Sequence, residues 1–423
     1  MPSRRLASSR VSPVMPPSES IRECPDCGLF QTVPEPRAGA TARCPRCDAV
    51  LMRARRDPLG APLALAATGL VLFAIAAGMP FLDMTLRGFG RETILASGPL
   101  ALRGEGMWEV AIVVLATTML APLARIAAMA WVLAGLRMRI PPRGLPVVFR
   151  WVEMLRPWSM VEVFLLGVLV AYTRLVALAT VEVGGALYAL AGLMLVMAAA
   201  DAALDPEMVW ETLRRRGLCP GPGAPGAAGP IGCDSCGLVS HGSVTCPRCG
   251  HTLHRRKPNS LHRTWALLLA AALLYVPANL LPVMTVISFG RGRPDTILSG
   301  VEQLARSGLW PLAALVFFAS ITVPVLKLVG LVTMLIATHR GSAARLRERA
   351  LLYRIVDSVG RWSMIDVFMV SILTAIVRLG LIASIHPGPG VIAFCGVVIL
   401  TTLAAMSFDP RLMWDAAQRG NTP

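Results

Sequence analysis

Two seven-residue stretches decide the fold: Trp158-Ser159-Met160-Val161-Glu162-Val163-Phe164 and Trp362-Ser363-Met364-Ile365-Asp366-Val367-Phe368. Each opens an apolar run long enough to cross a membrane, and each run reaches an arginine 12 residues after the acid, Arg174 or Arg378. At 1.5 Å per residue, acid and arginine lie roughly 18 Å apart along one helix, so each needs partners on other helices. Burying charge in a membrane is costly, and its repetition indicates a duplicated functional device.

The composition is that of an integral membrane protein. Of the 423 residues, 55% are hydrophobic and only 16% are charged, whereas soluble proteins have about 25% charged residues. The net charge of +16 comes from basic residues placed mainly between apolar runs, which favours contact with anionic lipid over nucleic-acid binding. No Walker loop, nucleophile elbow or dinucleotide fingerprint is present, so the sequence predicts neither ATP binding nor an enzyme.

The apolar runs predict an all-α polytopic protein with four membrane helices in each half. The expected spans are 61–82, 108–136, a run opening at residue 158, 185–203, 265–287, 309–338, 362–384 and 391–407. In the second span of each half a proline precedes a cation by three residues, at Pro122 and Arg125 and again at Pro324 and Lys327. Each half has an even number of spans, so the two repeats are parallel.

Eight of the ten cysteines form four Cys-x-x-Cys pairs, two pairs ahead of each half. The predicted metal ligands are Cys24, Cys27, Cys44 and Cys47, then Cys233, Cys236, Cys246 and Cys249. Four thiolates at this spacing predict a structural zinc ribbon in each half, two zinc ions in all. Such a site has no vacancy, so His241, His251 and His254 are not expected to be ligands.

These features divide the chain into seven segments. They are a disordered tail (1–23), zinc ribbon 1 (24–58), transmembrane domain 1 (59–206), a flexible linker (207–232), zinc ribbon 2 (233–257), transmembrane domain 2 (258–415) and a tail (416–423).

Arginine placement predicts the orientation. With a cytoplasmic N-terminus, ten arginines of residues 1–60, five of 137–156 and six of 338–361 lie in the cytoplasm, against six on the outer side. Positive residues favour the cytoplasmic side, so both termini and both ribbons are expected there.

The ionisable and hydroxyl residues inside the spans form the candidate transport site. In the second half we expect Lys327, Ser363, Asp366 and Thr402 to form a proton relay, with Arg378 on the same helix. The first-half counterparts are Arg125, Ser159, Glu162 and Arg174. A static network that fixes helix packing is the alternative, and for Arg125 and Lys327 so is repair of the helix at the proline.

A ribbon followed by four spans, twice over, resembles the paraquat-inducible protein A family. The motifs that carry the resemblance are Asn279-Leu280-Leu281-Pro282-Val283-Met284, Ser299-Gly300, the stretch from Trp362 to Phe368, and Phe408-Asp409-Pro410. The resemblance implies an inner-membrane protein of Gram-negative bacteria that loads or unloads lipids for a periplasmic tunnel of mammalian-cell-entry (MCE) domain proteins. The first half has Gly78-Met79-Pro80 where the second has the asparagine motif, so we expect the second half to carry more of the activity.

Two other functions are compatible with the sequence. The Cys-x-x-Cys pairs could serve a membrane-bound metal or redox sensor, and the buried charges could serve an ion-coupled exporter that acts without a partner. The interpretation that we carry forward is a lipid-transport subunit with an apolar cavity for acyl chains.

Overall fold

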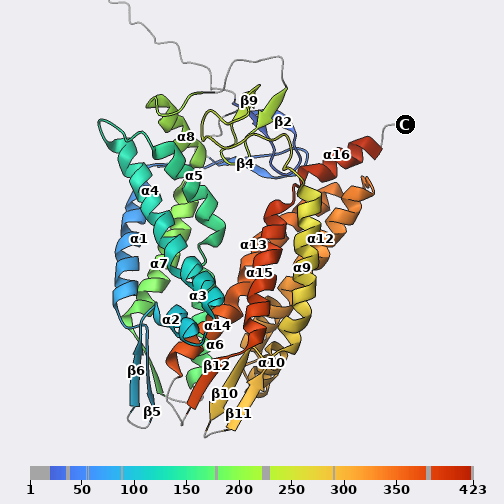
Figure 1. Ribbon diagram of the computed structural model, residues 1–423. Coiled ribbons are helices and arrows are strands. Elements are labelled where there is room, and N and C mark those ends of the chain that lie inside the picture. Colours follow the sequence, from blue (N-terminus) through green and yellow to red (C-terminus); the bar gives the residue numbers. More distant parts are fainter. Residues whose placement is uncertain are drawn as a thin grey trace, which may run out of the picture.

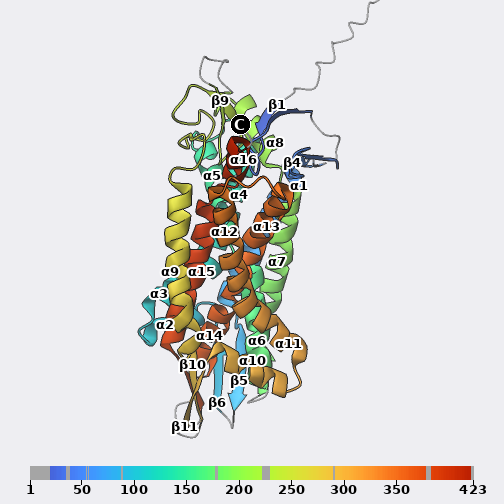
Figure 2. The ribbon, with the colours of Figure 1, turned by 90° about the vertical axis from the view of Figure 1, so that its right-hand side faces the viewer.

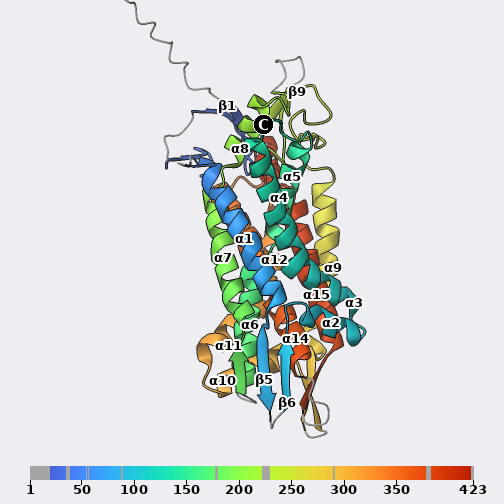
Figure 3. The same cartoon turned by 90° about the vertical axis from the view of Figure 1, so that its left-hand side faces the viewer.

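The computed structural model describes residues 20–34, 39–53, 55, 57–86, 89–176, 180–221, 229–288, 291–377 and 383–420. Most of the predicted N-terminal tail, and Arg378, lie outside the described residues. Figure 1 shows two helical bundles side by side, with the cysteine-containing segments at one end and two small sheets at the other. We call these the ribbon end and the sheet end; views from either side show the same layering (Figures 2 and 3).

Eight helices are long and apolar enough to cross a membrane, as predicted. The first half contributes α1 (Gly60–Gly78), the run Trp108–Arg137, the run Leu145–Val176, and α7 (Gly185–Ala203). The second half contributes α9 (Ser260–Leu280), the run Trp310–His339, the run Leu346–Ile376, and α15 (Pro389–Ser407). The same four-helix order therefore occurs twice.

The second run of each half contains a π-helical turn just before its proline. The first run consists of α3 (Trp108–Leu115), η1 (Ala116–Leu120) and α4 (Ala121–Arg137), and the second of α11 (Trp310–Phe317), η3 (Phe318–Thr322) and α12 (Val323–His339). In η1 the Ala121 N–H donates to the carbonyl of Ala116, and in η3 the Val323 N–H donates to that of Phe318. A wider turn of this kind accommodates a proline without ending the helix.

The third run of each half begins earlier than the sequence predicts. We expected arginine-rich loops before Trp158 and Trp362, but α5 (Leu145–Leu155) and α13 (Leu346–Val359) occupy them. In α5, Leu145, Phe149 and Val152 are buried on one helical face, so Arg150 lies on an amphipathic helix rather than in a loop. The short helices η2 (Arg156–Trp158) and η4 (Gly360–Met364) then lead into α6 (Val161–Val176) and α14 (Ile365–Ile376).

The sheet end contains two three-stranded antiparallel sheets. Their strand orders are β6-β5-β7 and β11-β10-β12, and their strands are β5 (Leu82–Leu86), β6 (Phe89–Thr93), β7 (Thr180–Val183), β10 (Met284–Ser288), β11 (Arg291–Asp295) and β12 (Ala383–Pro387). The short segment between the third and fourth spans of the first half is not a simple turn, because β7 within it pairs with β5, Leu82 facing Val183. Each hairpin is followed by a short helix, α2 (Ser97–Gly104) or α10 (Ile297–Arg306).

Helices α6 and α14 hold the two halves together. Within each half, α1 packs on α7 and α9 on α15, while α6 and α14 pack on each other across the halves. The rings of Phe164 and Phe368 meet edge to face with centroids 5.6 Å apart. Every residue of α14 from Ile365 to Ile376 is buried, so this helix is the centre of the whole molecule.

Two amphipathic helices lie at the ribbon end, α8 (Pro206–Arg215) and α16 (Arg411–Gly420). Both fall partly in segments that we expected to be linker or tail. Trp210 of α8 is only 2% exposed and packs edge to face on Phe149 at 5.1 Å. In α16, Ala416 and Ala417 are buried, so both segments are docked helices.

Candidate functional site: two metal centres and a buried polar cluster

The four Cys-x-x-Cys pairs fold into matching tight turns. In each pair the residue after the second cysteine has a positive φ and donates its N–H to the carbonyl of the first cysteine. Three of these residues are glycine, which adopts that conformation without strain; the fourth is Asp48, with φ 61°. Three of these turns each connect the two strands of a hairpin. The strand pairs are β1 (Ser20–Glu23) with β2 (Phe30–Val33), β3 (Thr41–Arg43) with β4 (Val50–Arg53), and β8 (Pro230–Gly232) with β9 (Val239–His241).

The predicted ligands gather into two buried four-sulfur groups, Cys24, Cys27, Cys44 and Cys47, and Cys233, Cys236, Cys246 and Cys249. The Sγ atoms of Cys24 and Cys47 are 3.5 Å apart and those of Cys27 and Cys44 are 3.6 Å apart. The distances in the second group are 3.6 and 3.5 Å. Tetrahedral zinc with Zn–S bonds of about 2.3 Å requires sulfurs about 3.8 Å apart, and none of the ten cysteines forms a disulfide. Both groups therefore fit a tetrahedral metal ion.

The first ribbon (ribbon 1, β1–β4) docks on the second half of the chain. Its cysteines share an apolar cluster with Leu331, Phe408 and Trp414. Arg354 of α13 donates to the carbonyl of Cys47 at 2.6 Å and pairs with Asp26 at 3.0 Å. The guanidinium of Arg46 lies over the ring of Trp414 at 4.3 Å.

The second ribbon (ribbon 2, residues 230–254) docks on the first half through the equivalent residues. Arg150 of α5 donates to the carbonyl of Cys249 at 3.3 Å. Arg248 lies over the ring of Trp210 at 5.7 Å and pairs with Glu207 at 3.0 Å. Each ribbon thus precedes one half in sequence but caps the other half in space, with β4 running between the bundles (Figure 1).

Arg411 joins both ribbons to the second half. Only 3% exposed, it pairs with Asp409 at 2.9 Å, with Asp234 of ribbon 2 at 2.9 Å and with Glu23 of ribbon 1 at 3.3 Å. Burial alone raises the pKa of Asp409, but the hydrogen bonds and charge of Arg411 outweigh it and hold that pKa below its ordinary value. The ribbon end is therefore an electrostatic junction as well as an apolar one.

Lys327 lies deep in the second half, 2% exposed. Its Nζ donates to the hydroxyl of Thr402 at 3.1 Å and to that of Thr401 at 3.3 Å. Gly360 of η4 leaves room for the side chain, because a Cβ there would lie 2.7 Å from Nζ. Of the predicted relay, Lys327 and Thr402 are in contact.

Arg125, at the equivalent position, has an acidic partner instead. Its guanidinium pairs with Asp201 of α7 and donates to the carbonyl of Val152 at 3.4 Å. Within the residues that the structure describes, neither Arg125 nor Lys327 donates to the helix carbonyls near its proline; the π turns accommodate the proline instead. The two halves thus differ: Arg125 forms an ion pair with a carboxylate, whereas Lys327 bonds two hydroxyls and has Asp357 of α13 only as a more distant charged neighbour.

Asp366 and Arg174 come together from opposite halves. Both line a small cavity of about 20 Å³ that also includes Asp295 and Gly300. Asp366 is 2% exposed, and its electrostatic neighbours are Ser320 and Arg174. Within the described residues neither carboxyl oxygen of Asp366 has a hydrogen-bond partner, and no contact joins Asp366 to Lys327. The predicted cluster is therefore divided between two places along one bundle.

The remaining candidates have different surroundings. Ser159 and Ser363 are buried, and their hydroxyls have no hydrogen-bond partner in the described part of the chain. Glu162 is 40% exposed and pairs with Arg361 at 3.2 Å, so it is not a buried counterpart of Asp366. Each acid that opens a third span therefore has a basic neighbour in the other half, Arg361 for Glu162 and Arg174 for Asp366.

Sequence reasoning missed several partners. Asp201 lies inside an apolar span and has Ala405 at the equivalent position, so the comparison of repeats did not single it out. Ser320 matches the buried Thr118 of the first half, and this paired hydroxyl was overlooked. Arg361 immediately precedes Trp362, and we counted it only as an orientation signal. An acid within an otherwise apolar span, such as Asp201, was the available signal.

These features define a multi-pass membrane protein built from two parallel four-helix repeats, with a pair of four-cysteine centres at one end. The chain belongs to the paraquat-inducible protein A family, whose model matches residues 59–214 and 261–418. Both matched segments correspond to the helical halves.

The curated relatives extend over nearly the whole chain. The Intermembrane transport protein PqiA of Escherichia coli (strain K12) is 35% identical over 398 residues, covering 93% of this chain and 95% of the relative. The Lipophilic envelope-spanning tunnel protein A of the same organism is 32% identical over 430 residues, 99% of this chain and 97% of the relative. A Probable intermembrane transport protein of Haemophilus influenzae is 28% identical over 432 residues, covering 99% of this chain and 100% of that protein. No solved structure shows significant similarity.

Proposed function

We propose that this protein is the inner-membrane subunit of an intermembrane lipid-transport system. Its family membership and the names of its relatives support transport between membranes. It works on membrane lipids as a transporter rather than as an enzyme, without ATP or nucleic acid. The sheet end faces the periplasm and delivers lipid to, or receives it from, a tunnel protein of MCE type, and both termini and both ribbons lie in the cytoplasm.

The observation that carries a transport mechanism is the line of buried polar groups along the second half. Ser320 and Lys327 lie two turns apart on one helix, roughly 10 Å. The hydroxyls of Ser320 and Ser363 have no hydrogen-bond partner in the described residues, and Ser363 lies on the same face of its helix as Asp366. Ser320 is a neighbour of Asp366, and in the sequence Ser363 lies between Asp366 and Gly360, the glycine against which Lys327 packs. We infer that these hydroxyls provide sites through which a proton could pass between Lys327 and Asp366.

Proton movement along this line would be coupled to opening between the halves. Asp366 attracts Arg174 only while it is ionised, so protonation weakens the contact between the two halves. The cavity beside them, about 20 Å³, is too small for an acyl chain, so the proposal requires the halves to separate there. The second half then carries more of the activity, because the corresponding Arg125 is neutralised by Asp201.

Replacing the two ends of the relay tests this mechanism. Lys327→Ala and Asp366→Ala should each abolish complementation of a transporter-deficient strain under membrane stress, at unchanged protein level. Lys327→Arg should fail as well, since a guanidinium keeps its proton whereas an ammonium can release it. Arg263→Ala, on an exposed turn of α9, is the control and should behave as wild type. Wild-type complementation by both alanine variants would contradict the relay.

We also propose that both ribbons hold zinc and that the metal is structural. In each ribbon, two Cys-x-x-Cys turns together supply four sulfurs. Zinc bound there would stabilise segments that have few apolar residues of their own. A metal or redox sensor needs cysteines that react or exchange metal, whereas all eight of these cysteines are buried. The packing of the ribbons against α5, α8, α13 and α16 favours a bracing role.

A further inference from the structure

A cavity of about 430 Å³ lies at the ribbon end of the first half, within the size range of small-ligand sites. Its walls come from β1, β4 and the segment after it, from the beginning of α4, the end of α5 and the start of η2, from the end of α7 and the start of α8, and from one turn of ribbon 2. Five arginines line it: Arg22, Arg53, Arg55, Arg125 and Arg156. The transport mechanism above uses none of these cations.

The acids in the cavity are already occupied. Asp201 pairs with Arg125, and Glu207 pairs with Arg22 at 3.2 Å and with Arg248. Asp205 caps α8 by accepting from the N–H groups of Glu207 and Met208. The fourth acid, Glu153, has Arg156 and Arg125 as its cationic neighbours.

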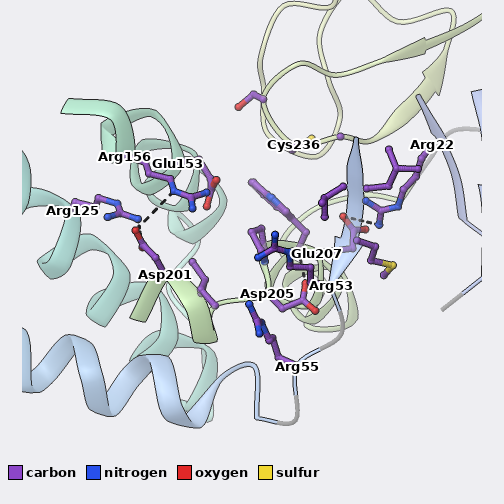
Figure 4. Close-up of a pocket in the computed structure, with 18 residues that line it drawn as sticks. Arg22, Arg53, Arg55, Arg125, Glu153, Arg156, Asp201, Asp205, Glu207 and Cys236 are labelled. Atoms are coloured by element: carbon purple, nitrogen blue, oxygen red, sulfur yellow. Dashed lines mark hydrogen bonds and ion pairs between the residues drawn. The ribbon is translucent and has the colours of Figure 1, made fainter. Parts of the chain in front are cut away.

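Two arginines are left over. Arg53 and Arg55 line the cavity, and within the described residues neither has an ion pair or a side-chain hydrogen bond (Figure 4). The Nε of Arg55 is buried without a hydrogen-bond partner. A buried donor without a partner is unfavourable, and this applies to Arg55, whereas Arg53 is exposed. The planar set of donors on each guanidinium matches the oxygens of a phosphate group.

An apolar crease continues from this cavity into the bundle. It is lined by Leu65, Gly69, Ile126 and Met197, and it shares Arg125 and Asp201 with the cavity. The crease lies between α1, α4 and α7. A polar compartment with surplus positive charge that adjoins an apolar surface matches an amphiphile with an anionic head.

We propose that this cavity binds a phosphate group through Arg53 and Arg55, and that the chain of an anionic phospholipid lies along the crease. The crease itself has a volume of about 10 Å³, so the chain rests against its apolar side chains rather than being enclosed by them. A free phosphate would use the same two arginines without the crease. The inference does not depend on transport, since a bound lipid there could equally be a fixed structural component.

Binding can be measured on the purified full-length protein after removal of endogenous lipid. Native mass spectrometry with dioctanoyl-phosphatidylglycerol should show one saturable site, and Arg53→Gln with Arg55→Gln should weaken it at least tenfold. Arg255→Gln, an exposed ribbon-end arginine, is the matched control and should leave binding unchanged. Arg53→Lys with Arg55→Lys should retain part of the affinity, because the charge remains while the two-pronged hydrogen bonding is lost.

Competition separates the two sources of phosphate. If millimolar inorganic phosphate displaces the lipid, and the double glutamine variant binds that phosphate less well, the site takes free phosphate. If inorganic phosphate does not compete, the site takes the lipid. Equal lipid binding by wild type and by the double glutamine variant, at matched thermal stability, would overturn the proposal.

Discussion

At the scale of single residues, the ribbon end depends on Arg411. One guanidinium contacts carboxylates from ribbon 1, ribbon 2 and the second half. Glu23 and Asp409 are themselves almost completely buried, so they depend on this cation to remain charged. Removing one partner of a buried ion pair costs more than the pair contributes, because the other charge is left uncompensated.

Arg411→Met should therefore destabilise the protein strongly, on the order of 3 kcal/mol. The measurement is thermal unfolding in detergent, with Arg263→Met as the control for loss of an exposed arginine. An unfolding midpoint equal to that of the control would show that the junction is dispensable.

The same variant should change the response to acid. The pKa of Asp409 is lowered in the folded protein, so its ionised form contributes stability above the unfolded-state pKa, and this contribution is lost as the pH falls through the lower folded value. Without Arg411 that pKa rises, so the protein should lose stability at a higher pH than wild type on acidification.

At the scale of elements, the informative feature is the exchange of ribbons. Arg354 and Trp414 of the second half hold ribbon 1, and Arg150 and Trp210 of the first half hold ribbon 2. Each four-cysteine centre should therefore stabilise the helices of the other half rather than those that follow it in sequence. A metal ion bound to a ribbon is then part of the packing of the distant helices.

Single cysteine substitutions test this crossed dependence. Cys27→Ser should lower the metal content from two zinc ions per chain to one, and should speed hydrogen exchange in α13 but not in α5. Cys236→Ser should do the reverse, which makes each variant the control for the other. Helices α8 and α16 are not used as readouts, because Arg22 of ribbon 1 pairs with Glu207 of α8 and Asp234 of ribbon 2 pairs with Arg411 of α16. Faster hydrogen exchange in the half that follows the altered ribbon in sequence would refute the crossed docking of the ribbons. Iron instead of zinc on elemental analysis would favour a metal or redox sensor.

At the scale of the whole molecule, two bundles meet along α6 and α14. A Cβ on Gly167 would lie 2.9 Å from the Cβ of Phe368 and 3.2 Å from the carbonyl oxygen of Ile365. The helices approach this closely because the glycine has no side chain, as small residues allow elsewhere in membranes. Across the same interface Arg174 faces Asp366 and Glu162 pairs with Arg361.

Gly167→Leu should push the halves apart and lower stability by about 1–3 kcal/mol, the usual cost of overpacking. The loss should be visible as a lower unfolding midpoint and as weaker protection of α14 from hydrogen exchange. Gly192→Ala is a suitable control, because the Cβ there would meet only the tip of Leu72 at 3.4 Å. Unchanged protection of α14 would show that the halves are not held at this contact.

The sequence predicted what depends on local pattern. Cysteine spacing predicted the eight cysteines that form the two four-sulfur groups, and apolar run length predicted the eight spans. The repeat pointed to Lys327, Asp366 and Arg174 as candidates, and Thr402 was noted as a hydroxyl in the last span. It could not assign each ribbon to a half, since equivalent residues such as Trp210 and Trp414 offer the same docking surface. It also missed α5 and α13, because their arginines resembled those of a loop, and it placed Lys327 and Asp366 in one cluster although they lie apart along the bundle.

The crossed docking also limits how such an architecture could have arisen. An ancestor with one ribbon and one four-helix bundle could have made these contacts only as a dimer, in which the ribbon of each copy docked on the bundle of the other. Gene fusion would then have turned a symmetric dimer into one chain and released the two copies to diverge. After such a fusion, Lys327 could keep a role in transport while Arg125, at the equivalent position, became part of a structural ion pair.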